Sequence, residues 1–163
     1  MSNLKLRGIY AMLVTPFNKN EDVDYQALRA EVDWCAAQGV QGVVATPSIG
    51  EFACLSTEER WKCFEAVSDQ CSKHPTLTKI ATVAATHSRE VVEHCRVAKE
   101  LGFAAAQLVP PYYWQPDEDE VYRHYQTAAD TGLPIVVYHN PALSKFYMKR
   151  EFLGKLSELP GVV

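Results

Sequence analysis

The sequence lacks long hydrophobic runs and clustered basic residues. No apolar run approaches the roughly 20 residues of a transmembrane helix, and residues 1–7 lack the apolar centre of a signal peptide. The 16 basic and 20 acidic residues are interleaved, with a net charge of −4, so no basic stripe is available for a nucleic-acid backbone. We therefore expect a cytoplasmic protein that binds neither nucleic acid nor a membrane.

The sequence also lacks the residue spacings of metal sites and disulfide frameworks. Its five cysteines are odd in number and are never closer than eight residues, which argues against zinc knuckles and paired disulfides. Only His87 and His94 share a predicted helix, and the other histidines are scattered. We expect no metal site, and we expect the cysteines to be buried or half-buried free thiols.

The chain instead alternates short apolar runs with amphipathic segments. The apolar runs predict strands over residues 8–17, 42–46, 78–85, 103–109 and 133–138, with the opening of a sixth over 159–163. The intervening helices are expected over residues 24–39, from residue 56 onward, and over 86–102, 117–129 and 148–156. Asp24 is a candidate N-cap, and Ser56 with Glu59 has the spacing of a capping box.

Five strand–helix units fit two α/β architectures: a doubly wound open sheet and part of a (β/α)8 TIM barrel. No glycine-rich phosphate-binding turn follows any predicted strand, so the main reason for the open sheet is missing. A complete barrel takes about 200 to 250 residues. We therefore expect residues 1–163 to be the N-terminal five-eighths of a single TIM-barrel domain, contributing about the first five units.

Hydroxyl side chains recur where the predicted strands end. The fifth strand is expected to be buried on both faces and ends at Tyr138, and Thr15, Ser48 and Tyr113 follow the ends of earlier strands. Because α/β folds assemble their sites at the carboxyl ends of parallel strands, these residues are candidates for a common site. The alternative for Tyr138 is a core tyrosine whose hydroxyl has found a partner.

Four motifs together resemble one family. They are Val14-Thr15-Pro16-Phe17, the turn Ser48-Ile49-Gly50-Glu51 with Leu55-Ser56, Pro111-Tyr112-Tyr113 before Pro116, and Val137-Tyr138-His139-Asn140-Pro141. Their order and spacing resemble the dihydrodipicolinate synthase and N-acetylneuraminate lyase superfamily over essentially the whole chain. The resemblance implies a TIM barrel and a class I aldolase or lyase, in which a lysine forms a Schiff base with pyruvate or another 2-oxo acid and no cofactor is needed.

The resemblance also implies roles for individual residues. Tyr138 matches the catalytic tyrosine that moves protons, and Ser48 matches a hydroxyl of the proton relay. The backbone amides of Ser48 and Ile49 would hold the substrate carboxylate, as successive amides in a turn can, and Thr15 is expected to line the same substrate site. Tyr113 matches a tyrosine that is inserted into a neighbouring subunit's site, so the resemblance implies that it is a catalytic residue and that the protein is a homodimer or homotetramer.

Three departures from the family pattern limit what the resemblance implies. Ile49 replaces a second hydroxyl residue of the turn. Ala142-Leu143-Ser144 stands where true dihydrodipicolinate synthases carry an arginine for the acceptor carboxylate, and an apolar leucine cannot replace a guanidinium. The Schiff-base lysine would lie just beyond Val163, and Lys145 is a poor substitute.

These departures favour a relative of the synthases with another acceptor, similar to the hydratase-aldolases, rather than a true dihydrodipicolinate synthase. The 163 residues alone are then expected to be inactive. Two alternatives stay open: a catalytically inactive truncated half-barrel that binds a partner, and a protein that binds a 2-oxo acid without turning it over.

Overall fold

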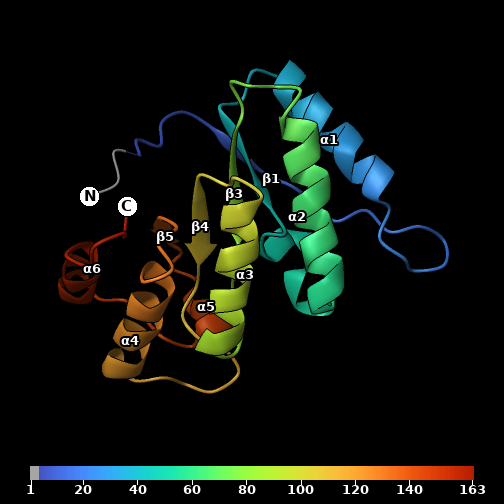
Figure 1. Ribbon diagram of the computed structural model, residues 1–163. Helices are drawn as coiled ribbons and strands as arrows, with labels where there is room; N and C mark the ends of the chain where they lie inside the picture. The colour runs from blue at the N-terminus through green and yellow to red at the C-terminus, as the bar shows by residue number, and fades with distance from the viewer. Residues whose placement is uncertain (1–3) are drawn as a thin grey trace. The chain divides into compact units, whose positions relative to one another are not determined.

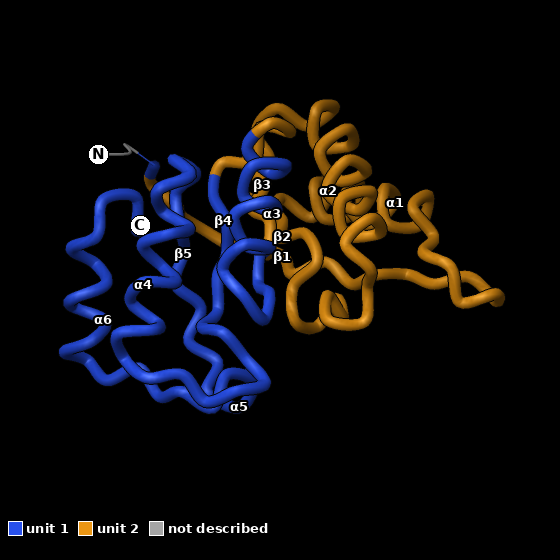
Figure 2. Tube along the Cα trace, turned by 60° about the horizontal axis from the view of Figure 1, so that its bottom comes forward, with its two compact units in different colours: residues 1–4, 83–99, 105–163 blue, residues 5–82, 100–104 orange. Residues whose placement is uncertain are grey.

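The computed structural model describes residues 4–163. The described residues do not include Met1, Ser2 and Asn3. These three residues belong to the segment 1–7, in which no signal peptide is expected. The chain forms two compact units (Figure 2). Unit 2 contains residues 5–82 and 100–104, and unit 1 contains residue 4 with residues 83–99 and 105–163.

Unit 2 holds three parallel strands that pair in chain order. Its elements are β1 (Tyr10–Met12), α1 (Tyr25–Ala37), β2 (Gly42–Ala45), the 3₁₀ turns η1 (Ser48–Gly50) and η2 (Phe52–Cys54), α2 (Thr57–Cys71) and β3 (Thr78–Thr82). Gly42 of β2 is in register with Tyr10 of β1 and with Thr78 of β3. Helices α1 and α2 contact each other in this unit (Figure 1).

The helices of unit 2 begin where their capping residues predict. The Asp24 side chain accepts hydrogen bonds from the N–H groups of Gln26 and Ala27 at the start of α1. Ser56 and Glu59 form the expected capping box at the start of α2. Gly39, which follows α1, has a φ of 76°, the left-handed conformation that glycine adopts without strain.

Unit 1 repeats the alternation of helix and strand. Its elements are α3 (Ser88–Glu100, of which Glu100 belongs to unit 2), β4 (Ala105–Leu108), α4 (Glu118–Ala129), β5 (Ile135–Val137), α5 (Pro141–Ser144) and α6 (Arg150–Ser157). Strands β4 and β5 are parallel, with Ala106 opposite Ile135. Helix α4 buries Val121, Tyr125 and Ala128 as its spacing predicts, and a second capping box, formed by Asp117 and Glu120, begins this helix.

Several local predictions are wrong. The fifth strand is not buried along its length: Ile135 is buried, but Val136 and Val137 are only half-buried as the strand opens into the loop that carries Tyr138. The expected opening of a sixth strand, in contrast, is confirmed by a parallel bridge between Ile135 and Val162. Cys54 is exposed, since it lies in the short surface turn η2, whereas the other four cysteines are buried.

Element boundaries also differ from the prediction. The first strand covers only Tyr10–Met12 of the expected residues 8–17, and α6 begins at Arg150 rather than at residue 148. Beyond β1 the Leu13 N–H still donates to the Val44 carbonyl of β2 at 3.1 Å, and the Val14 N–H donates to the Glu31 carboxylate at 3.1 Å. Within residues 4–163, none of the helices combines the length and the apolar character needed to cross a membrane.

Candidate active site

The turn that follows β2 in unit 2 is strained at both ends. Thr46, the residue after the strand, has a φ of 45°, and Glu51, the residue after η1, has a φ of 58°. A β-branched residue such as threonine rarely adopts a positive φ, and such strain of about 1–3 kcal/mol persists only where the surrounding structure imposes it. Residues held in this way concentrate at functional sites, which makes the turn between Thr46 and Glu51 a candidate.

The backbone hydrogen bonds of this turn leave its first two amides without an acceptor inside the turn. The N–H of Gly50 donates to the Pro47 carbonyl at 2.9 Å, and the N–H of Glu51 donates to the Ser48 carbonyl at 3.1 Å. The first amides of a helical turn, here those of Ser48 and Ile49, have no acceptor inside the turn and can receive a carboxylate. The Ile49 side chain is 62% exposed, so its contribution to this arrangement comes from the backbone.

Three hydroxyl groups lie on or beside the turn. Thr15, after β1, is buried and donates its hydroxyl to the Gly50 carbonyl at 2.6 Å. The hydroxyl oxygens of Thr46 and Ser48 are buried and have no hydrogen-bond partner among the described residues. Thr15 is therefore occupied in holding the turn, whereas the Ser48 hydroxyl has no partner among the described residues.

Gly50 is required by the close approach of the backbone. A Cβ atom at this position would lie 2.7 Å from the Leu13 carbonyl oxygen and 2.9 Å from Cδ of Pro47. This close approach explains why a glycine stands at position 50, and it fixes the shape of the turn between Thr46 and Glu51.

Tyr138 follows β5 in unit 1 and is half-buried. Its N–H donates to the Leu108 carbonyl at 2.8 Å, which extends the pairing of β4 and β5 by one residue. Its hydroxyl oxygen lies 3.1 Å from Nδ2 of Asn140. Tyr138 is therefore not a core tyrosine with a buried hydroxyl; that description fits Tyr125, whose hydroxyl donates to the Leu108 carbonyl at 2.7 Å.

The loop after β4 presents two exposed aromatic residues. Tyr113 is 74% exposed and has a φ of 84°, again in the left-handed region. Its ring contacts that of Trp114 edge-to-face, with a centroid distance of 5.0 Å. An exposed aromatic pair held by a strained backbone is typical of a contact surface, and Tyr112 beside it is half-buried.

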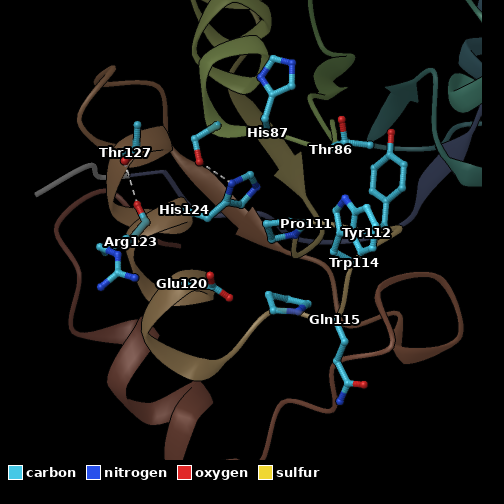
Figure 3. Close-up of a pocket in the computed structure, with 12 residues that line it drawn as sticks. Thr86, His87, Pro111, Tyr112, Trp114, Gln115, Glu120, Arg123, His124 and Thr127 are labelled. Atoms are coloured by element: carbon cyan, nitrogen blue, oxygen red, sulfur yellow. Dashed lines mark hydrogen bonds between the residues drawn. The ribbon is translucent and has the colours of Figure 1, made fainter.

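Unit 1 also contains an open pocket of about 430 Å³ between the start of α3, the loop after β4 and α4 (Figure 3). Tyr112, Trp114, His87 and His124 contribute to its lining. Neither Tyr138 nor Tyr113 lines it. The pocket was not predicted, because its residues come from three segments without a shared sequence motif.

His124 is the buried polar residue of this pocket. Its Nδ1 atom lies 2.8 Å from the Ser88 hydroxyl, and the two side chains join α4 to the start of α3 (Figure 3). Burial lowers the pKa of His124 to about 4, because the charged imidazolium would lose its hydration. The ring is therefore neutral near pH 7, and it links the two helices by a hydrogen bond.

The lysines of the described chain offer no free, desolvated amine. Burial lowers the pKa of Lys79, at the start of β3, but its Nζ atom donates to the Ser68 hydroxyl at 2.6 Å and to the Leu101 carbonyl at 2.8 Å. Lys145 is exposed and has a φ of 54° after α5.

Among residues 4–163, no group of three or more His, Cys, Asp or Glu side chains is arranged to hold a metal ion.

The predicted site residues are thus placed within their own units. Thr15, Ser48 and Ile49 surround one turn of unit 2, and Tyr138 and Tyr113 follow neighbouring strands of unit 1. The expectation that Ser48 and Tyr138 share one pocket stays a prediction. Asn140, the partner of the Tyr138 hydroxyl, was not predicted, although an asparagine before a proline is a helix N-cap signal.

Known proteins resemble this chain over nearly its whole length. The model of the dihydrodipicolinate synthetase family matches residues 5–163. A 4-hydroxy-tetrahydrodipicolinate synthase from Nitrobacter hamburgensis is 35% identical over 162 residues, which are 99% of this chain and 54% of that protein. An N-acetylneuraminate lyase from Rhizobium meliloti is 34% identical over 161 residues, 98% of this chain and 53% of the lyase.

A solved structure confirms the predicted fold. The crystal structure of the chloride-inhibited dihydrodipicolinate synthase from Acinetobacter baumannii, complexed with pyruvate, matches with a TM-score of 0.92 and 32% identity. The match covers 98% of this chain and 54% of that structure, which is a TIM barrel. The chain therefore has the fold of part of a (β/α)8 barrel, and it spans about half the length of the curated relatives it matches.

Proposed function

Because this chain belongs to the dihydrodipicolinate synthetase family, we propose that its protein is a class I aldolase, lyase or synthase that acts on pyruvate or another 2-oxo acid. The substrate forms a Schiff base with a lysine outside residues 1–163, and no cofactor or metal takes part. The observation that carries this proposal is the family match over residues 5–163, which includes all four of the motifs named above.

Tyr138 is the acid and base of the proposed reaction, and Ser48 is its relay. The half-buried position of Tyr138 after β5 supports this role, because the carboxyl ends of strands carry the sites of TIM barrels. The buried Ser48 hydroxyl without a partner in unit 2 supports a relay that continues to another group. The amides of Ser48 and Ile49 hold the substrate carboxylate, and Thr15 shapes their turn through its bond to Gly50.

The proposed acceptor is not a carboxylate-bearing aldehyde of the kind that true dihydrodipicolinate synthases use. Leu143 lies half-buried in the first turn of α5, and its N–H already donates to the Asn140 side chain. This turn offers no guanidinium to an acceptor carboxylate. An aldehyde with an apolar or aromatic substituent suits the segment better, as in hydratase-aldolases.

The proposed assembly is a homodimer or homotetramer in which Tyr113 enters a neighbouring subunit. Its 74% exposure and strained backbone support a contact that is completed by another copy.

Borohydride trapping tests the proposal. The expressed protein is incubated with pyruvate and sodium borohydride, and its intact mass is measured. The proposal expects a covalent adduct on one lysine, which requires the desolvated amine that forms an imine. Saturable pyruvate binding without an adduct would instead favour a 2-oxo-acid-binding protein. Neither binding nor an adduct, together with a defined oligomer, would favour an inactive half-barrel.

A further inference from the structure

The helix that follows Tyr138 fixes the orientation of the Asn140 amide. Asn140 is the N-cap of α5, and its Oδ1 atom accepts the Leu143 N–H at 3.2 Å. A backbone N–H can only donate, so the oxygen of the amide must face Leu143. The NH₂ group of Asn140 therefore faces the other way, where it lies 3.1 Å from the Tyr138 hydroxyl oxygen.

The Asn140 amide in turn fixes the direction of the Tyr138 hydroxyl. An amide NH₂ group can only donate, so the phenolic oxygen must accept this hydrogen bond. Its own hydrogen is then directed to a different partner. We propose that Asn140 is the positioning residue of Tyr138, holding the phenol as a hydrogen-bond acceptor from the protein and as a proton donor toward the substrate. The catalytic part of this inference rests on the proposed function.

Asn140 is itself held in place from several sides. Its carbonyl oxygen accepts hydrogen bonds from the Ser144 N–H and the Ser144 hydroxyl, both at 3.0 Å. Ser144 is fully buried and also accepts the Phe146 N–H at 3.4 Å. Pro141 occupies the first turn of α5, where its fixed φ suits a helix start. The donor to Tyr138 is therefore a rigid part of the fold.

The arrangement suits both halves of a proton transfer. When the Tyr138 O–H bond breaks, the proton passes to an oxygen of the substrate and the electron pair stays on the phenolic oxygen. The Asn140 N–H continues to donate to that oxygen while it carries the negative charge, and hydrogen bonds to charged groups are stronger than those to neutral groups. When the proton returns from the substrate, the phenolic oxygen accepts it and the starting arrangement is restored.

Two substitutions separate positioning from helix capping. Asn140→Asp and Asn140→Ser both keep a side-chain oxygen that can cap α5, because Asp, Asn and Ser are all good N-caps. The aspartate replaces the donor near Tyr138 by an acceptor, which turns the phenolic hydrogen away from the substrate. The serine shortens the side chain and removes the donor without adding a charge.

One arm of the experiment is an NMR measurement, which does not require the protein to be catalytically active. In the expressed protein labelled with ¹⁵N, Tyr138→Phe is expected to shift the side-chain NH₂ signals of Asn140 and to leave the Leu143 amide signal in place. Unchanged Asn140 side-chain signals would overturn the proposal.

In the kinetic arm, we expect Asn140→Asp to lower kcat at least about tenfold. A positioned proton donor contributes roughly 10²- to 10⁴-fold to the rate, and the substitution should remove part of that contribution. The KM for pyruvate should stay within about twofold of the wild-type value, because other residues, Ser48 and Ile49, are proposed to hold the pyruvate carboxylate. Asn140→Ser should lower kcat less. Wild-type kcat in Asn140→Asp would overturn the proposal. If the wild-type protein forms no borohydride adduct with pyruvate, the proposed function fails instead, and the NMR arm still decides the direction of the hydroxyl.

Discussion

The buried hydroxyl of Tyr125 donates to the Leu108 carbonyl at 2.7 Å, at the point where β4 ends. The same carbonyl accepts the Tyr138 N–H, so the helix α4 is fastened to the loop that carries the proposed catalytic tyrosine. The burial that raises the pKa of Tyr125 also keeps its phenol protonated, and so able to donate, over the whole working range of pH.

Tyr125→Phe should lower the free energy of unfolding by about 1 kcal/mol, the usual net value of one hydrogen bond. The loss should not be larger, because the Leu108 carbonyl keeps the Tyr138 N–H and no cavity forms. Urea denaturation measures the change, with Tyr122→Phe on the same helix as the control. Equal losses in the two variants would contradict a role for the Tyr125 hydroxyl.

Ser48→Ala should separate activity from stability. The Ser48 hydroxyl oxygen is buried without a partner in unit 2, so its removal should change the free energy of unfolding by less than about 0.5 kcal/mol. Turnover should fall about a hundredfold or more if the hydroxyl relays protons. Ser48→Thr keeps a hydroxyl and is the matched control. A strong loss of stability in Ser48→Ala would show that the group is structural.

Gly50→Ala should distort the turn between Thr46 and Glu51, which we propose binds the substrate carboxylate. The added Cβ would meet the Leu13 carbonyl oxygen at 2.7 Å, and such overpacking costs about 1–3 kcal/mol. Gly154→Ala in α6 makes the same chemical change where nothing lies within 4 Å, and it should stabilise the protein by about 0.4–1 kcal/mol. Thermal unfolding and pyruvate titration compare the two variants. Full pyruvate affinity in Gly50→Ala would contradict the role of the turn.

His124 should make stability depend on pH in mildly acidic solution. Burial lowers its pKa from 6.5 to about 4, so between these values the unfolded chain binds a proton that the folded chain does not. The free energy of unfolding should therefore fall as the pH drops from about 6.5 to about 4, by up to about 1.4 kcal/mol per pH unit from this residue.

The control for this prediction is His124→Asn, which can keep a hydrogen bond to Ser88 but does not titrate. Urea denaturation of both proteins between pH 4 and 7 should give a shallower dependence for the variant. Parallel curves would show that His124 takes up a proton in the folded protein as readily as in the unfolded chain.

The features that local chemistry determines were predicted from the sequence. Asp24 and the Ser56–Glu59 box mark helix starts because capping involves residues two or three positions apart. The alternation of strands and helices, and with it the fold, follows from the apolar pattern in the same way. Cys54 was predicted to be buried or half-buried but is exposed. A small apolar residue in a surface turn carries no local signal of its exposure.

The sequence proposed residues for the candidate site, but it could not predict their hydrogen bonds. Motif resemblance singled out Tyr138 and Ser48, and it could not reveal that Thr15 is occupied by the Gly50 carbonyl while Ser48 has no partner in unit 2. Nor could it reveal the positive φ of Thr46, because a threonine after a strand is ordinarily extended. These properties depend on how distant segments pack, which no short sequence pattern encodes.

The hydrogen bonds of Lys79 help to identify the lysine that is modified in the borohydride trapping experiment, when the modified peptide is mapped. Its partly desolvated amine is the kind of group that could give background labelling. However, this amine already donates to the Ser68 hydroxyl at 2.6 Å and to the Leu101 carbonyl, just after α3, at 2.8 Å. Reductive alkylation at that nitrogen would have to break both bonds. A peptide modified elsewhere would therefore identify the reactive lysine, whereas one containing Lys79 would report a locally opened protein.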